Sequence, residues 1–442
     1  MHKYQKIGIK TPRILLPNKN IDLRKWAVIA CDQFTAQPEY WQEVENIVGD
    51  APSTYHMILP EVFLETPQEE ERIKNANIAM QNYLQSGIFT SMEGFIYVRR
   101  KLNGQTRRGL MVCLDLEHYD YTPGAQTLIR ASEGTIVDRL PPRIRIRKQA
   151  VLETPHILVL FDDSLDTVFG PLEDQLGTFE KLYDFELMLG SGHLEGYAIN
   201  NDAIQQGILT ALEQLIDPET FANKYALEPG KHQPMLFAMG DGNHSLATAK
   251  AIWEEIKPSV GSDHPARYAL VEIENVHDPA LAFEPIYRVL FDLNTDILQE
   301  MHAYWGDSLR VEEVDTPEEL IAAVDAARGS AHKVGMITSD GLKLITIHDA
   351  KENLPVGTLQ HFLDMFMANQ GAEKIDYIHG EDVLFEMGTV EGNVGFYIPG
   401  MDKSDLFKTM ILDGALPRKT FSMGSAKTKR FYMECRRIQP AS

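Results

Sequence analysis

The chain of 442 residues contains only three cysteines, Cys31, Cys113 and Cys435, which lie far apart. An odd number at this spacing fits neither a disulfide framework nor a thiolate zinc site, so we expect a reducing compartment. No apolar run approaches the roughly 18 residues that a membrane-spanning helix needs. The first residues also lack the apolar stretch of a secretory signal. These absences predict a cytoplasmic protein with no membrane partner.

Positive charge is scarce as well. Lys and Arg number 42 against 64 Asp and Glu, which gives a formal net charge of −22. A surface of this sign repels phosphate backbones, so we expect no nucleic acid among the partners. Hydrophobic residues make up 44% of the chain, which is ordinary for a folded protein. The length predicts roughly two to three domains, and we expect three regions, at 1–165, 166–295 and 296–442.

Helix and strand signals alternate along the whole chain, which predicts an α+β or mixed α/β fold with mixed sheets. The β-rich runs 94–101 and 109–116 are expected to form a hairpin through Asn103-Gly104, with a loop longer than two residues. Capping patterns at Thr66-Pro67-Gln68-Glu69 and Thr316-Pro317-Glu318-Glu319 predict the starts of two helices.

The most informative segment is Gly240-Asp241-Gly242-Asn243-His244-Ser245, which follows an expected strand at 235–239 and opens an expected helix. A further strand is expected at 268–273, so this unit predicts a parallel strand pair with a right-handed crossover. Gly240 and Gly242 permit a tight turn. Free amides at the start of the helix, together with its dipole, favour an anion.

Asp241 and His244 add a carboxylate and an imidazole beside this anion pocket. These groups can move a proton next to a bound phosphate. The alternative is structural, with Asp241 and Asn243 capping the helix and His244 bonded to a neighbour. Asp32 is a third candidate catalytic residue, because it follows the apolar run 26–30 and so is expected at the end of a strand. It is a candidate base or Mg²⁺ ligand, or else a cap of the helix expected near Pro38.

Arginines are expected to supply the positive charge that a phosphate needs. Arg143, Arg145 and Arg147 alternate with isoleucines, which predicts a strand with three guanidinium groups on one face. Guanidinium groups suit phosphate, although such a face can also be solvated and paired with acids such as Glu153. The candidate residues for binding phosphate or substrate are Gly240, Gly242, Asn243, Ser245, Arg130, Arg143, Arg145, Arg288, Arg418, Lys419 and Lys429.

Four stretches carry a family resemblance: Ala27 to Thr35 with Pro38 to Trp41, Leu128 to Thr135, Gly240 to Lys250, and Leu416 to Gly424. They resemble the bacterial and archaeal family called domain of unknown function 1015, and they span nearly the whole chain. That family is similar to the ParB and sulfiredoxin superfamily through an Asp-Gly-His-His-Arg type of turn. The resemblance implies a ParB/sulfiredoxin-like core, expected within 166–295. It also implies nucleotide phosphates bound at the helix after the turn and, in one branch, kinases of free serine.

The turn of this chain departs from the superfamily pattern. Asp241 and Gly242 match it, and His244 matches the second histidine, but Asn243 replaces the first histidine and Ser245 replaces the arginine. Because that arginine would contact phosphate, the resemblance implies that Ser245 and the helix amides, or cations from elsewhere, take its place. It also implies a link to serine metabolism.

We therefore expect an enzyme that binds a phosphorylated metabolite or a nucleotide and catalyses phosphoryl transfer or phosphate-ester hydrolysis on a small metabolite such as serine or phosphoserine. Mg²⁺ and ATP or ADP are the expected cofactors, and a second copy of the chain is a further candidate partner. The alternative is a non-catalytic nucleotide-binding sensor or partner-binding protein. A third interpretation is an NAD(P)-dependent oxidoreductase, because the turn half fits a dinucleotide fingerprint. No residue is assigned to a metal, since pairs such as His361 with Asp364 are common by chance.

Overall fold

The computed structural model describes residues 3–122, 124–134, 140–327 and 331–440. The chain divides into two compact units: unit 1 comprises Met1–Leu281 and Gly424–Ser442, and unit 2 comprises Ala282–Met423. The boundaries expected at 165/166 and 295/296 both fall inside a unit. Unit 2 is therefore an insertion in unit 1, and the last residues of the chain belong to unit 1. Both units combine helices with mixed or antiparallel sheets, as the alternating signals predicted.

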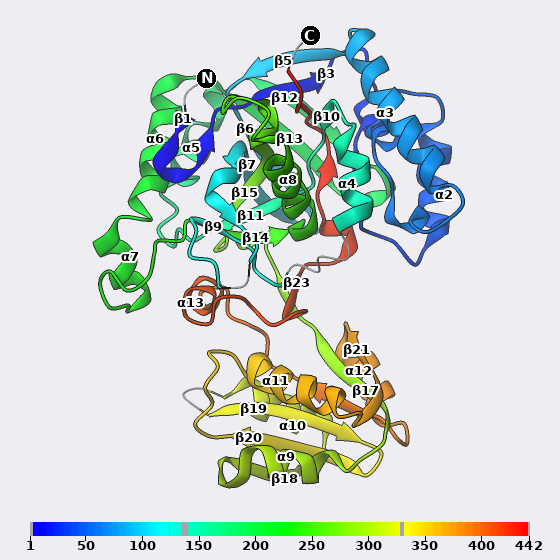
Figure 1. The fold of residues 1–442 in the computed structure, drawn as a ribbon, viewed down its shortest axis with the longest axis vertical. Coiled ribbons are helices and arrows are strands. Elements are labelled where there is room, and N and C mark those ends of the chain that lie inside the picture. Colours follow the sequence, from blue (N-terminus) through cyan, green and yellow to red (C-terminus); the bar gives the residue numbers. More distant parts are fainter. Residues whose placement is uncertain (1–2, 123, 135–139, 328–330, 441–442) are drawn as a thin grey trace. The chain divides into compact units, whose positions relative to one another are not determined.

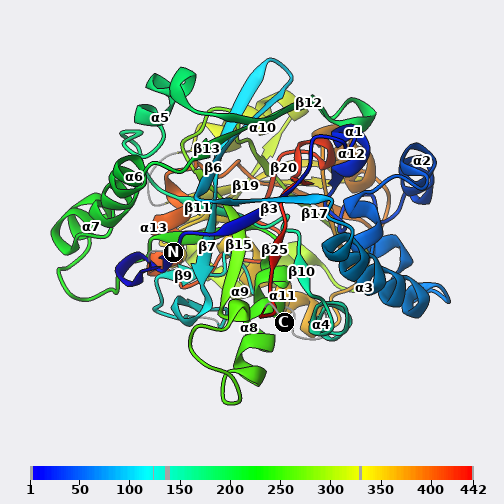
Figure 2. The same cartoon turned by 90° about the horizontal axis from the view of Figure 1, so that it is seen from above.

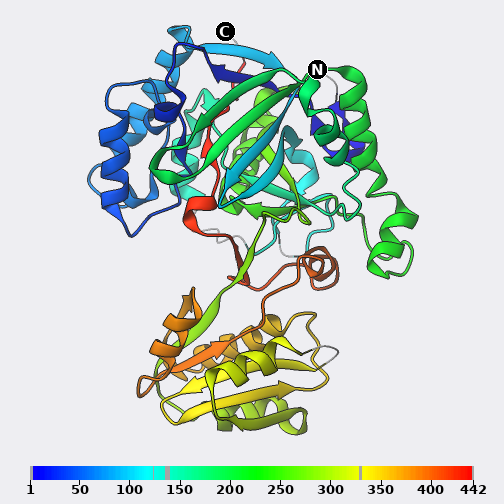
Figure 3. The ribbon, with the colours of Figure 1, turned by 180° about the vertical axis from the view of Figure 1, so that it is seen from behind.

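Unit 1 is built on one large sheet. Its main path runs in the order β12 (Lys181–Glu186), β13 (His193–Ile199), β6 (Phe95–Leu102), β7 (Gln105–Asp115), β15 (Tyr268–Asn275), β11 (Leu158–Phe161), β14 (Phe237–Asp241), β9 (Ile129–Arg130) and β8 (Tyr119–Asp120). The short strands β1 (Lys3–Tyr4) and β2 (Ile9–Lys10) are attached to β7. Figure 3 shows the antiparallel strands β12, β13 and β6 (green and cyan) from the side opposite to Figure 1.

The expected hairpin is present as β6 and β7, but its turn is shorter than expected. Leu102 pairs with Gln105, so only Asn103 and Gly104 form the turn. Both have positive φ, at 53° and 76°, which matches the twist of the flanking strands.

The prediction that the strands before and after the Gly240–Ser245 turn and its helix form a parallel pair is wrong. β11 lies between β14 and β15, and it pairs antiparallel with β14 and parallel with β15. The strands before and after the helix α8 (Asn243–Ile256) are therefore antiparallel and not adjacent. The crossover was misjudged because a strand from an earlier part of the chain inserts between them, which no local pattern reveals. This unit is thus not the parallel β-α-β arrangement on which a dinucleotide fingerprint depends.

Two hydrophobic cores lie on the two faces of this sheet. Ile96 and Val98 of β6 belong to one core, while Phe95 and Tyr97 belong to the other, as strand alternation requires. In Figure 2 the helices α2 (Pro38–Val48) and α3 (Glu69–Gln85) lie on one side of unit 1, with α6 (Asp202–Gln214) and α7 (Pro218–Tyr225) on the other. The described part of unit 1 also contains the short helices α1 (Leu23–Trp26), α4 (Leu140–Lys148) and α5 (Gly170–Asp174).

Paired short strands bring the chain's two ends together in unit 1. β4 (Val28–Ile29) pairs with β24 (Phe431–Tyr432), and β10 (Leu152–Glu153) pairs with β25 (Arg436–Arg437). A third ribbon joins β3 (Arg13–Pro17) to β5 (Phe89–Glu93). The C-terminal segment, red in Figure 1, is thereby fixed beside residues 28–31.

The arginine-rich segment is a helix, not the expected strand. Residues Leu140–Lys148 form α4. Pro141 and Pro142 stand in its first turn, where a missing amide hydrogen costs no helical hydrogen bond. The alternation of arginine and isoleucine covers only residues 143–147, which is too short to outweigh the helix-start signal of the two prolines. Arg143 and Arg147, four residues apart, therefore lie on one face of the helix, while Arg145 between them points in another direction.

Unit 2 contains an antiparallel sheet in the order β18 (Leu309–Val314), β20 (Gly341–Ile347), β19 (His332–Thr338), β22 (Val394–Tyr397), β17 (Tyr287–Leu293) and β21 (Ala372–Ile378). Its helices are α9 (Ile297–Trp305), α10 (Pro317–Asp325), α11 (Pro355–Ala368), α12 (Glu381–Gly388) and α13 (Asp405–Leu412). The cap expected at Thr316 is confirmed, since its hydroxyl accepts a hydrogen bond from the Glu319 amide. A ribbon of β16 (Phe283–Pro285) and β23 (Phe421–Met423) stands at the start and end of this unit.

Across the described ranges, every helix is too short or too polar to cross a bilayer.

Candidate functional site

The turn between β14 and α8 depends on a left-handed backbone at Gly242. This residue has φ 78° and ψ 27° and is the N-cap of α8. A Cβ here would lie 3.1 Å from the Ile157 Cα, so both the conformation and the space favour glycine. The Gly242 amide donates to Oδ1 of Asp241 at 2.9 Å, which fixes that carboxylate beside the helix start.

The N-terminus of α8 carries no side-chain cap. The dipole of this 14-residue helix adds positive potential at its first turn. Asn243 is buried and its side chain donates to the Ser132 hydroxyl at 3.3 Å. This contact joins two of the stretches singled out in the sequence, 128–135 and 240–250.

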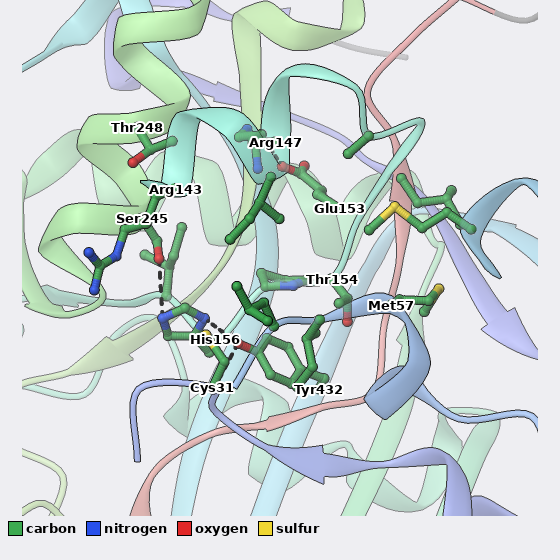
Figure 4. Close-up of a pocket in the computed structure, with 18 of the residues that line it drawn as sticks. Cys31, Met57, Arg143, Arg147, Glu153, Thr154, His156, Ser245, Thr248 and Tyr432 are labelled. Carbon is green, nitrogen blue, oxygen red and sulfur yellow. Dashed lines mark hydrogen bonds and ion pairs between the residues drawn. The ribbon is translucent and has the colours of Figure 1, made fainter. Parts of the chain in front are cut away.

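His156 occupies the centre of the site, in the segment that leads into β11. Its Nε2 shares a hydrogen bond of 3.2 Å with the hydroxyl of Ser245, on the first turn of α8. Its Nδ1 shares one of 2.8 Å with the hydroxyl of Tyr432. Tyr432 in turn accepts the Cys31 amide at 3.1 Å. Figure 4 shows the imidazole held between Ser245 and Tyr432. The ring is thus fixed from both sides.

Asp32 faces this imidazole, with Oδ2 3.9 Å from Nε2 of His156. Burial by itself would raise the pKa of Asp32, but the charges of His156 and Lys429 and a hydrogen bond from Gln33 outweigh it and hold the pKa below its usual value. The carboxylate is therefore ionised at neutral pH. By contrast, burial raises the pKa of the Cys31 thiol well above its usual range, so Cys31 stays protonated.

Lys429 supplies a cation beside the turn. Its Nζ lies 3.2 Å from Oδ2 of Asp241. Two buried arginines of the central sheet position it, because Arg100 donates to the carbonyl oxygens of Lys427 and Lys429 and Arg107 donates to that of Thr428. The structure thus places Lys429 beside the Gly240–Ser245 turn, while its binding of phosphate stays a prediction.

The arginines of α4 have separate partners. Arg143 forms an ion pair with Glu61, and Arg145 pairs with Glu69 and Glu70. Burial raises the pKa of Glu61, although Arg143 partly offsets this. Arg143 lines a cavity together with His156 and Ser245, whereas Arg145 does not line it. Only one of these two predicted phosphate-binding arginines is therefore next to the site.

Four other cations were predicted to bind phosphate, and one of them, Arg130, belongs to unit 1. Arg130 is buried, and its guanidinium donates to the carbonyls of Thr127 and Gln233, which precede β9 and β14. It therefore lies at the end of these strands opposite to the Gly240–Ser245 turn. The remaining three, Arg288, Arg418 and Lys419, belong to unit 2.

Within unit 2, two of these arginines have structural partners. Arg288 is fully buried and donates to Gln360 and to the carbonyl of Arg418, while Arg418 pairs with Asp364.

His244, predicted as catalytic, is half-buried on the first turn of α8, and its carbonyl accepts the Thr248 hydroxyl.

Sequence reasoning missed His156, Glu61 and Tyr432. His156 is a single histidine after a proline, with no partner at a spacing that suggests chemistry. Its partners Asp32, Ser245 and Tyr432 are spread over 400 positions of the chain, so only the tertiary structure brings them together.

The fold and site define a mixed α+β protein whose helix α8 presents an uncapped N-terminus to a cluster of an aspartate, a histidine and a lysine. The chain belongs to the family described as "Protein of unknown function (DUF1015)", whose model matches residues 15–366. That match includes Asp32, His156 and Ser245 but ends before Lys429 and Tyr432. The family resemblance drawn from the sequence is thus confirmed, while the more distant ParB and sulfiredoxin likeness stays a prediction.

Several solved structures show distant similarity. A conserved hypothetical protein from Pyrococcus furiosus is 11% identical, with 73% of this chain and 90% of that chain covered and a TM-score of 0.34. A free serine kinase in complex with AMP is also 11% identical, with coverages of 70% and 86% and a TM-score of 0.35. C-terminally truncated SbnI from Staphylococcus aureus is 8% identical, with coverages of 73% and 85% and a TM-score of 0.35. No curated protein matches the chain.

Proposed function

We propose that this protein is a phosphotransferase that moves the terminal phosphoryl group of a nucleoside triphosphate to a hydroxyl group of a small metabolite. One observation carries the proposal: Asp32, His156 and Lys429 converge at the uncapped start of α8. Phosphoryl transfer needs positioning, positive potential and a proton acceptor rather than elaborate covalent chemistry. This site offers all three.

The phosphates would bind at the first-turn amides of α8, with Lys429 and Arg143 as nearby cations. The oxygen of the acceptor hydroxyl would bond to the terminal phosphorus of the triphosphate, and Asp32 would accept the proton of that hydroxyl. The bridging phosphorus–oxygen bond would break at the same time, which releases the nucleoside diphosphate. Asp32 suits this role better than Asp241, because Oδ2 of Asp32 faces His156 whereas both oxygens of Asp241 are bonded, one by the Gly242 amide and the other by Lys429. His156 would orient Asp32 and the Ser245 hydroxyl.

Mg²⁺ fits the donor set, because Asp241 offers hard oxygen atoms of the kind that this ion prefers alongside phosphate oxygens. When bound, the ion would neutralise part of the phosphate charge. Similar solved structures carry AMP or ADP by name, and the proposal gives this chain the same class of ligand. It rests on the geometry of the site and not on that distant likeness.

The test is the substitution Asp32→Asn. We expect phosphoryl transfer from ATP to an acceptor pool that includes serine to fall on the order of 100-fold or more, because the proton acceptor is lost. Nucleotide affinity, measured by calorimetry, is expected to change little. Asp50→Asn is the matched control, because Asp50 is an exposed residue outside the site. Nucleotide binding without transfer in the unsubstituted protein would instead support a non-catalytic sensor, and absence of nucleotide binding would overturn the proposal.

A further inference from the structure

A cavity with a volume of about 140 Å³ lies beside His156. One wall comes from α4 and the residues after it, where Arg143, Ile146 and Ala150 recur at helical spacing. The rest of the lining combines apolar side chains, among them Met57, Leu59, Leu64, Met80, Leu152 and Ile157, with polar groups that include Glu61, Glu153, Thr154 and His156. Figure 4 shows Met57 on the side of the cavity away from Arg143.

The polar groups of the inner wall already have partners. Glu153 pairs with Arg147 at 2.5 Å and with Arg436 at 2.6 Å. The Thr154 hydroxyl donates to the carbonyl of Glu434 at 3.1 Å. Polar contact with a ligand is therefore concentrated at one edge, where His156 and the half-buried pair of Glu61 and Arg143 lie.

The size and lining of the cavity select among ligand groups. An apolar cavity of about 150 Å³ holds a benzene molecule, so this one has room for a phenyl ring or a branched alkyl group of about five or six carbons. A nucleobase of similar bulk carries donors and acceptors around its edge, and burying these against aliphatic walls costs free energy. The hydroxymethyl side chain of serine would leave most of the cavity unfilled.

We infer that the acceptor of the phosphoryl group is an alcohol with an apolar body, which enters the cavity while its hydroxyl group lies between Asp32 and His156. This inference rests on the proposed function and names its substrate class. The acceptor oxygen bonds to the terminal phosphorus of the triphosphate, the hydroxyl proton passes to Asp32, and the nucleoside diphosphate leaves with the electron pair of the broken bond. With the acceptor in the cavity, the nucleotide would bind on the side of the site formed by the first turn of α8.

The experiment compares benzyl alcohol and 3-methyl-1-butanol with ethanol and serine, by calorimetry and by phosphoryl transfer from ATP. We expect the two apolar alcohols to bind and to be phosphorylated in preference to ethanol and serine. Ala150→Phe fills the cavity and should weaken their binding about tenfold or more, with nucleotide affinity unchanged. Ile146→Phe provides a second filling variant should Ala150→Phe fail to fold. Ala203→Phe, at an exposed position of α6, is the control.

The outcomes separate this inference from the proposed function. Transfer to serine or ethanol with no response to apolar alcohols overturns the inference and leaves phosphoryl transfer standing. Binding of benzyl alcohol that both filling variants leave unchanged also overturns it. Binding that the filling variants abolish, without transfer from any nucleotide, supports an apolar ligand and overturns phosphoryl transfer instead.

Discussion

The site depends on single residues that hold unusual positions. Gly242 adopts a left-handed backbone against Ile157, and His156 is buried with both ring nitrogens bonded. The tight turn at Gly242 could be anticipated from the sequence, because two glycines between a strand and a helix indicate such a turn. The position of His156 could not be anticipated, because a buried histidine acquires its role from partners that only the fold brings close. Local signals therefore located the turn but not the imidazole beside it.

Replacement of Gly242 by alanine tests the turn. A left-handed alanine costs about 1–2 kcal/mol, and the Cβ would also press on Ile157 at 3.1 Å. Gly230→Ala is the matched control, since Gly230 has φ 79° with nothing within 4 Å of its Cβ position. We expect urea denaturation to show a larger loss of stability for Gly242→Ala, together with weaker nucleotide binding. Equal losses in the two variants would contradict a packing role for this glycine.

At the scale of elements, sequence patterns were reliable where they were local and unreliable where they were short or depended on neighbours. The cap at Thr316 formed as predicted, and the β6–β7 hairpin formed with a shorter turn than predicted, whereas α3 has Gln68 and not Thr66 as its N-cap. The alternation at 143–147 predicted a strand, but the two prolines before it start a helix. The insertion of β11 between β14 and β15 arises from tertiary pairing, so no pattern in residues 235–273 could indicate it.

The C-terminal segment is joined to the sheet by a buried ionic cluster. Arg430, just before β24, binds Glu272 of β15 and also Glu434, each at 2.6 Å. Arg430→Met would leave two buried carboxylates without their cation and should destabilise unit 1 by about 3–5 kcal/mol. The control is Lys6→Met, whose exposed ion pair with Glu213 should contribute little to stability, because solvent screens it. Chemical denaturation measures the loss of stability in each variant. A loss for Arg430→Met as small as that for Lys6→Met would show that the ionic cluster does not anchor the C-terminal segment.

The stability of the protein should also depend on pH through Glu274 of β15. Complete burial raises its pKa from 4.5 to about 8, although Arg107 lies 2.9 Å away. The folded state therefore holds a proton that the unfolded chain releases between these values, so stability should fall as pH rises from about 4.5 to 8. Glu274→Gln should flatten this decline in urea denaturation. An unchanged pH profile in that variant would assign the decline to other groups.

The largest-scale prediction concerns the division into two units. The central residues of the site, Asp32, His156, Asp241, Ser245 and Lys429, all belong to unit 1, while the chain leaves that unit after Leu281 and re-enters it at Gly424. In unit 2, Phe283 pairs with Met423 across the β16–β23 ribbon, so the two ends of the insertion are neighbours. A linker of about four to six residues can therefore replace 282–423.

Because unit 1 has its own cores on both faces of its sheet, we expect the shortened protein to unfold in one cooperative transition. Nucleotide affinity measured by calorimetry should stay within a few-fold of that of the full chain. Apolar-dye binding and the loss of a cooperative transition would show instead that unit 1 requires the insertion to fold. A well-folded unit 1 without nucleotide affinity would mean that residues of unit 2 complete the site, and Arg288, Arg418 and Lys419 would then be the first to substitute.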